Sequence, residues 1–137
     1  MKRKRALWWL LLVLYAATIF ALSSFPLKER EPVVPIPHED KLLHFLEFFC
    51  FFVLSWKALH NRNRMFYALL ITGIYAGSDE LHQLFVPMRE ASILDWFAGF
   101  TGGGVAGMIV VWLCARFPLP GIARIRILGR SDHKEED

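Results

Sequence analysis

The sequence contains few of the residues that soluble and cross-linked proteins depend on. Only 21% of its 137 residues are charged, and only two are cysteines, Cys50 and Cys114. Both cysteines lie inside apolar segments at different expected depths, which argues against a disulfide and against a paired-thiol metal site. The chain has no DNA-binding motif, so nucleic acid is not an expected partner.

What the chain has in abundance is hydrophobic sequence, at 55% of all residues. It is concentrated in four runs near the length of about 20 residues that a helix needs to cross about 30 Å of hydrocarbon. These runs leave no room for a separate soluble domain. We therefore predict an all-α integral membrane bundle of four transmembrane helices, at Ala6–Phe25, Leu42–Leu59, Met65–Val86 and Ile93–Phe117.

The first run has two interpretations. The basic residues 2–5, the apolar residues 6–20 and a potential cleavage site at Ala21-Leu22-Ser23 are typical of a signal peptide. We favour an uncleaved first helix, because the run is long for the apolar region of a signal peptide, which spans about 7–15 residues.

The distribution of basic residues predicts the orientation. Most Lys and Arg residues lie before the first helix, between the second and third, and after the fourth. The positive-inside rule therefore places both termini in the cytoplasm, in a multi-pass membrane protein. Residues 1–117 are the expected membrane domain, and residues 118–137 are an expected cytoplasmic tail, first basic and then acidic.

Two further features concern the connections and the packing. The proline-rich segment Pro26–Asp40 is expected outside, as a linker or as a lid over the outer face. A short external turn at residues 87–90 should make the third and fourth helices antiparallel neighbours. Glycines spaced four apart, which allow close helix approach in lipid, support that pairing: Gly73 and Gly77, then Gly99, Gly103 and Gly107.

Three predicted helices carry costly polar residues at a single level, the outer third of the bilayer. An ionisable group inside a membrane segment is a functional-site hypothesis by default. Taken singly, each residue also has a structural explanation, such as a hydrogen bond between helices or an interaction with a helix dipole. We expect the set to form one extracytoplasmic pocket, in which Lys41 and Arg89 pair with the acids: Asp40, Lys41, His44, Glu47, Asp79, Glu80, His82, Gln83, Arg89, Ser92 and Asp95.

These residues form an ordered pattern. Asp40-Lys41-x-x-His44-Phe45, followed by Glu80-x-x-Gln83-x-Phe85-x-Pro87-x-Arg89-x-x-Ser92-x-x-Asp95, resembles the VanZ-like family of bacterial membrane proteins. Phe20-x-x-Ser23-Ser24 is also similar to that family, and the resemblance covers about residues 7–115. One position departs from the family, because Gly99 stands where an asparagine is usual.

The resemblance implies a four-helix, multi-pass integral membrane protein of the bacterial inner membrane. The founding member is associated with low-level resistance to the glycopeptide teicoplanin, which points to a role in the cell envelope. The resemblance assigns no reaction to the matching positions, which are Asp40, Lys41, His44, Glu80, Gln83, Arg89, Ser92 and Asp95.

Three functions follow from these observations. The pocket could bind an anionic membrane lipid or a lipid-linked cell-wall precursor, or block the approach of a glycopeptide. Alternatively, a small enzyme could use Glu80 or His44 as acid–base, with Asp95 a further catalytic candidate and Arg89 stabilising charge. A transporter is disfavoured, because the inner half lacks a polar path toward Lys57. His44, Glu47, Asp79 and His82 could ligate a metal, but they match no recognised ligand spacing, and neither metal nor cofactor is expected.

Overall fold

The part of the chain that the structure describes folds into four helices. The computed structural model describes residues 2–25 and 39–117. The helices are α1 (Lys2–Ser23), α2 (Glu39–Ala58), α3 (Arg64–Gln83) and α4 (Ile93–Arg116). The described residues contain no strand, which confirms the all-α prediction for this part of the chain. The basic and acidic tail, and the proline-rich segment up to residue 38, lie outside the described residues.

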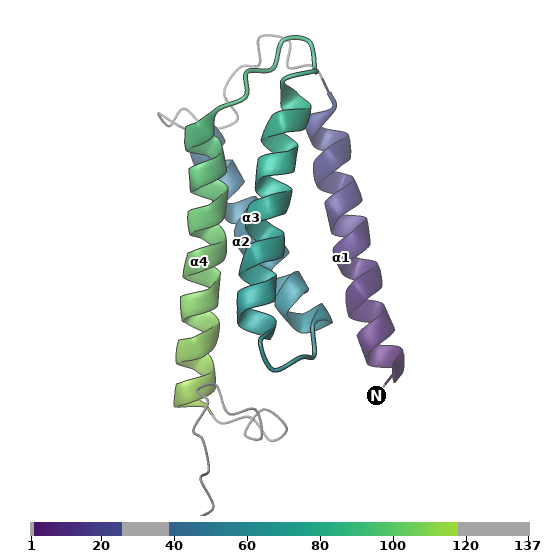
Figure 1. Cartoon of the computed structure of the whole chain (residues 1–137), viewed down its shortest axis with the longest axis vertical. Helices are drawn as coiled ribbons and strands as arrows, with labels where there is room; N and C mark the ends of the chain where they lie inside the picture. Colours follow the sequence, from purple (N-terminus) through teal and green to yellow (C-terminus); the bar gives the residue numbers. More distant parts are fainter. Residues whose placement is uncertain (1, 26–38, 118–137) are drawn as a thin grey trace, which may run out of the picture.

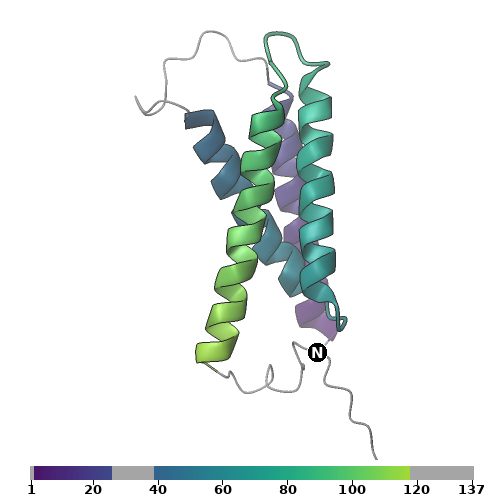
Figure 2. The same cartoon turned by 60° about the vertical axis from the view of Figure 1, so that its left-hand side comes forward.

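The helices run alternately up and down. The beginning of α1 and the end of α4 therefore lie at the same end of the bundle, and α2 and α4 begin at the other (Figure 1). Figure 2 shows that α2 crosses α4 at an angle instead of running alongside it. The contact between α2 and α4 is the most extensive in the bundle, while α1 rests mainly on α2.

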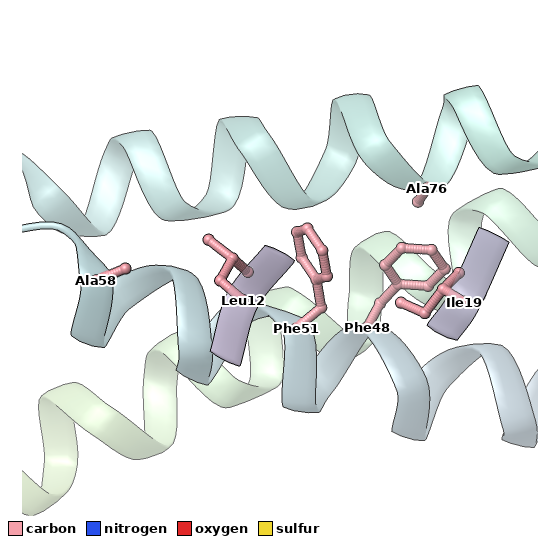
Figure 3. Close-up of a cluster of buried hydrophobic side chains, with 6 residues drawn as sticks. All are labelled: Leu12, Ile19, Phe48, Phe51, Ala58 and Ala76. Carbon is pink, nitrogen blue, oxygen red and sulfur yellow. The ribbon is translucent and has the colours of Figure 1, made fainter. Parts of the chain in front are cut away.

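An aromatic and aliphatic core lies where α1, α2 and α3 meet (Figure 3). Ile19 of α1 and Phe48 and Phe51 of α2 are almost fully buried there. The ring of Phe51 stacks on Tyr75 of α3, with ring centroids 4.8 Å apart and planes within 6° of parallel. In lipid such dense packing stabilises helix association through van der Waals contact, because hydrocarbon tails are as apolar as the core.

Glycine determines how closely α2 approaches α4. A Cβ placed on Gly102 would lie 2.1 Å from the backbone oxygen of Phe45, and one on Gly99 would lie 2.6 Å from the Phe48 ring. Two helix backbones can touch in this way only where no side chain separates them. Gly99, which replaces the family's usual asparagine, is therefore buried against a phenylalanine.

The predicted glycine packing between α3 and α4 is also present. Gly73 of α3 faces the Phe100 ring, and Gly103 of α4 faces Thr72. A hydrogen bond from Trp96 Nε1 of α4 to the Gly73 carbonyl, 3.0 Å long, fixes the same pair of helices. The glycine spacing thus predicted a true interface through Gly73 and Gly103, whereas Gly99 and Gly107 of the same series, like Gly102, face α2 instead.

The outside of the bundle is apolar on every helix. Each helix has apolar side chains that are at least half exposed, for example Val13 of α1, Leu43 of α2, Phe66 of α3 and Met108 of α4. Exposed apolar surface on this scale marks contact with lipid or with other protein. Among residues 2–25 and 39–117, two helical segments, Arg5–Ser23 and Ile93–Arg116, are long and apolar enough to cross a membrane.

Candidate functional site

Polar side chains from α2, α3 and α4 meet at the end of the bundle where α2 and α4 begin. Lys41 Nζ of α2 lies 3.1 Å from Asp95 Oδ1 of α4. One turn deeper on α2, His44 Nε2 lies 3.1 Å from Glu80 Oε1 of α3. Three helices that are separate in sequence therefore place ionisable groups side by side, as expected from their common predicted depth.

Glu80 is the residue that joins these helices. Its side chain is buried, and its second carboxylate oxygen, Oε2, accepts a hydrogen bond of 2.8 Å from the backbone N–H of Ser92. Ser92 immediately precedes α4, and its hydroxyl makes no capping bond. The predicted site residue Ser92 thus contributes its main chain, and Glu80 ties α3 to both α2 and the start of α4.

Asp79 and Gln83 form a second buried pair on α3. Gln83 Nε2 donates a 2.9 Å hydrogen bond to Asp79 Oδ2, as their spacing of one helical turn allows. Both residues are only 4% exposed. His44, Asp79 and Glu80 each offer one nitrogen or oxygen atom of the kind that binds metal ions, and these three atoms lie within 4.8 Å of one another.

The remaining predicted residues of α2 lie around His44. Asp40 has an exposed side chain and takes part through its carbonyl oxygen, 3.0 Å from His44 Nδ1. Since a carbonyl only accepts, Nδ1 carries the hydrogen. Glu47 is partly buried one turn further along, close enough to interact electrostatically with His44 and Asp79.

Arg89 and His82 make their hydrogen bonds at the end of α1. Arg89 donates from Nε to the Phe25 carbonyl, at 3.2 Å, and from Nη2 to the Leu22 carbonyl, at 2.9 Å. Among the described residues no carboxylate forms a direct ion pair with Arg89, although Arg89 is close enough to Glu47 to interact with it electrostatically. The carbonyls at a helix end lack partners within the helix and attract a cation, which explains why Arg89 binds there instead.

Ser24 is a polar residue of this end that the sequence did not single out as part of the site. Its hydroxyl lies 2.9 Å from His82 Nε2, and the Phe20 and His82 rings are in contact, with centroids 4.4 Å apart. The sequence signal for this contact is the pair Ser23 and Ser24, which ends the apolar run of the first helix. Together with Arg89, this contact joins the end of α1 to the connection between α3 and α4.

A large hollow in the described part of the chain lies elsewhere. It is a groove of about 570 Å³ between α3 and α4, near the opposite end, lined by residues such as Met65, Leu69 and Met108. None of its lining residues is ionisable. It is suited to apolar chains but not to chemistry, so the polar cluster remains the candidate site.

A small bundle of apolar-surfaced helices with a buried polar cluster at one end is typical of a membrane protein whose site lies near the membrane surface. The family comparison agrees. The chain belongs to the VanZ/LLP1 family, whose model matches residues 7–115, and this confirms the resemblance seen in the sequence. No curated protein and no solved structure matches the chain.

Proposed function

We propose that this VanZ-like protein crosses the bacterial inner membrane four times, with both termini in the cytoplasm. The excess of basic residues at the end where α1 begins supports this orientation. The apolar outer surface of α2 and α3, which carry exposed residues such as Leu46 and Ile74, supports the proposal that these two helices also cross the membrane. In this orientation the polar cluster faces the exterior, just below the membrane surface.

We further propose that the cluster binds the anionic head of a lipid or of a lipid-linked cell-wall precursor. The observation that carries this is the position of Lys41. Its side chain is 31% exposed while its ammonium contacts the buried carboxylate of Asp95, so it lies between solvent and the interior of the cluster. An incoming phosphate could take up the same ammonium, and the apolar helix faces could accommodate the lipid chains.

Binding of such a lipid at the outer surface would give the protein a role in the cell envelope. A protein that holds or shields a lipid-linked precursor at the outer surface would reduce the access of a glycopeptide to its target. We therefore propose that the protein lowers susceptibility to teicoplanin in cells that express it.

Lys41→Gln tests this function, and Lys57→Gln is its matched control. Lys57 lies on the same helix at the other end, where its ammonium is 4.6 Å from the centroid of the Trp8 ring. We expect Lys41→Gln to return the inhibitory concentration of teicoplanin to that of cells with empty vector. The same variant should lose anionic lipids that co-purify with the parent, as measured by mass spectrometry.

Lys57→Gln should resemble the parent in both measurements. If Lys41→Gln also resembles the parent while inserting normally, the proposed role of the cluster is wrong. Arg89→Ala is less informative, because Arg89 fixes the end of α1.

One observation favours a second function, that of a small membrane enzyme. His44 and Glu80 are in contact and shielded from water, an arrangement suited to acid–base catalysis on a lipid headgroup. Chemical change of a labelled lipid-linked substrate by the purified parent, but not by Glu80→Gln, would distinguish the enzyme from the binding protein.

A further inference from the structure

We propose that His44, Asp79 and Glu80 bind one divalent transition-metal ion. Their potential ligand atoms, an imidazole nitrogen and two carboxylate oxygens, lie within 4.8 Å of one another. Two ligand atoms of a tetrahedral zinc ion are about 3.4 Å apart, so side-chain movements of about 1–1.5 Å would bring all three into the coordination shell. The ligands come from two helices, which explains why no spacing along the sequence indicated a metal.

The contact between His44 and Glu80 is the first argument. His44 Nδ1 donates its hydrogen to the Asp40 carbonyl, so in a neutral imidazole Nε2 has a free lone pair. That lone pair is 3.1 Å from Glu80 Oε1, which also has only lone pairs. Within the described residues neither atom has a hydrogen-bond partner, and both are buried. Two such atoms in contact need a cation between them, which is either a proton on Nε2 or a metal ion bound to both. A proton would serve these two atoms alone, whereas a metal ion would also engage the neighbouring carboxylate of Asp79.

The balance of charge is the second argument. Asp79 and Glu80 are 4% and 7% exposed, so two adjacent carboxylates are held in the interior. The nearest strong cations are engaged elsewhere, since Lys41 contacts Asp95 and Arg89 binds carbonyls of α1. Removing two unbalanced carboxylates from water is costly, and one divalent ion would neutralise both.

The groups around the three ligands are those that usually support a metal site. Ligating histidines almost always donate their other N–H to a carbonyl or carboxylate, as His44 does to Asp40. Glu80 Oε2 is held by the N–H of Ser92, and Asp79 Oδ2 by Gln83. One imidazole with carboxylates suits zinc, iron or manganese, and three protein ligands leave a position open for water or a substrate oxygen.

The experiment is a titration of the metal-free, full-length protein with Zn²⁺, using detergent-purified protein with an affinity tag that contains no histidine. We expect one Zn²⁺ per chain and a melting temperature that rises with Zn²⁺ concentration. His44→Gln and Glu80→Gln should each weaken binding by well over about tenfold, because each removes a ligand. Gln83→Leu, which removes only the support of Asp79, should weaken binding by about 10–100-fold.

Two control variants separate this site from non-specific binding. His60→Gln removes a histidine at the other end of the bundle, and Glu90→Gln removes an exposed acid from the loop before α4. Both should bind Zn²⁺ like the parent. X-ray absorption of the Zn²⁺-loaded parent tests the ligands without any substitution, and we expect one imidazole together with carboxylate oxygens.

The inference is overturned if the parent binds no Zn²⁺, or if His44→Gln and Glu80→Gln bind it as tightly as the parent. It is also overturned if the absorption spectrum lacks an imidazole ligand. His44 and Glu80 would then be an ion pair in which the proton is the shared cation. These outcomes do not depend on lipid binding, so the proposed function and the metal site can fail separately.

Discussion

Met88 is, among the described residues, the only one other than glycine with a left-handed backbone, at φ 63°. This conformation places Cβ close to the following carbonyl oxygen and costs about 1–2 kcal/mol. The Met88 side chain is 64% exposed and contributes little packing. We predict that Met88→Gly raises the free energy of unfolding by about 1 kcal/mol, measured by SDS titration in mixed micelles.

Glu90→Gly is the matched control for this prediction. Glu90 is exposed in the same connection and has an ordinary φ, so glycine there only adds freedom to the unfolded chain. It should lower stability by up to about 1 kcal/mol. A loss of stability in Met88→Gly of the same size would contradict the assignment of strain to Met88.

At the level of single residues, the sequence predicted which polar groups share a depth but not which of them meet. Lys41 and Asp95 were expected at one level, and they form an ion pair. Depth along a helix follows from residue number, whereas the direction of a side chain depends on how each helix is rotated against its neighbours. That rotation is why His82 meets Ser24 of α1 instead of the cluster.

At the level of helices, the prediction concerns the close contact between α2 and α4. Gly102→Ala would place a methyl group 2.1 Å from the Phe45 backbone oxygen, so the two helices would have to separate. We expect a loss of about 2 kcal/mol or more in the free energy of unfolding, in the range of overpacked cores. Unfolding by SDS in mixed micelles measures it.

Gly104→Ala is the control within the same helix, because a Cβ there meets nothing within 4 Å. It should be neutral or stabilising by up to about 1 kcal/mol, since alanine is the better helix former. Equal effects of the two substitutions would show that helix propensity alone governs this segment.

Long apolar runs predicted the helices well, because the membrane-spanning length and the hydrophobic period are both properties of local sequence. They did not predict the crossing of α2 over α4 in Figure 2. Crossing angles depend on side chains from two helices at once, and Gly102 lies outside the series of glycines spaced four apart. For the same reason the sequence offered His44 and Asp79 as possible metal ligands but not Glu80, since the meeting of His44 on α2 with Glu80 on α3 depends on how both helices are rotated.

For the whole molecule, the prediction concerns orientation. In a variant whose cysteines are replaced by Cys50→Ala and Cys114→Ala, single cysteines at two exposed positions report which side each connection faces. We expect a membrane-impermeant maleimide to label Glu90→Cys in intact spheroplasts, and to label Asn61→Cys only after lysis. The opposite pattern would invert the bundle, place the polar cluster toward the cytoplasm and remove the basis of the envelope function.

The close approach at Gly102 has a consequence for the polar cluster. Phe45, whose carbonyl oxygen faces Gly102, is the chain neighbour of His44. A position with no side chain and no charge therefore sets the distance between α2, which carries Lys41 and His44, and α4, which carries Asp95. If the cluster binds a ligand as proposed, a change in the size of residue 102 would alter the spacing of the charged groups while leaving every one of them in place.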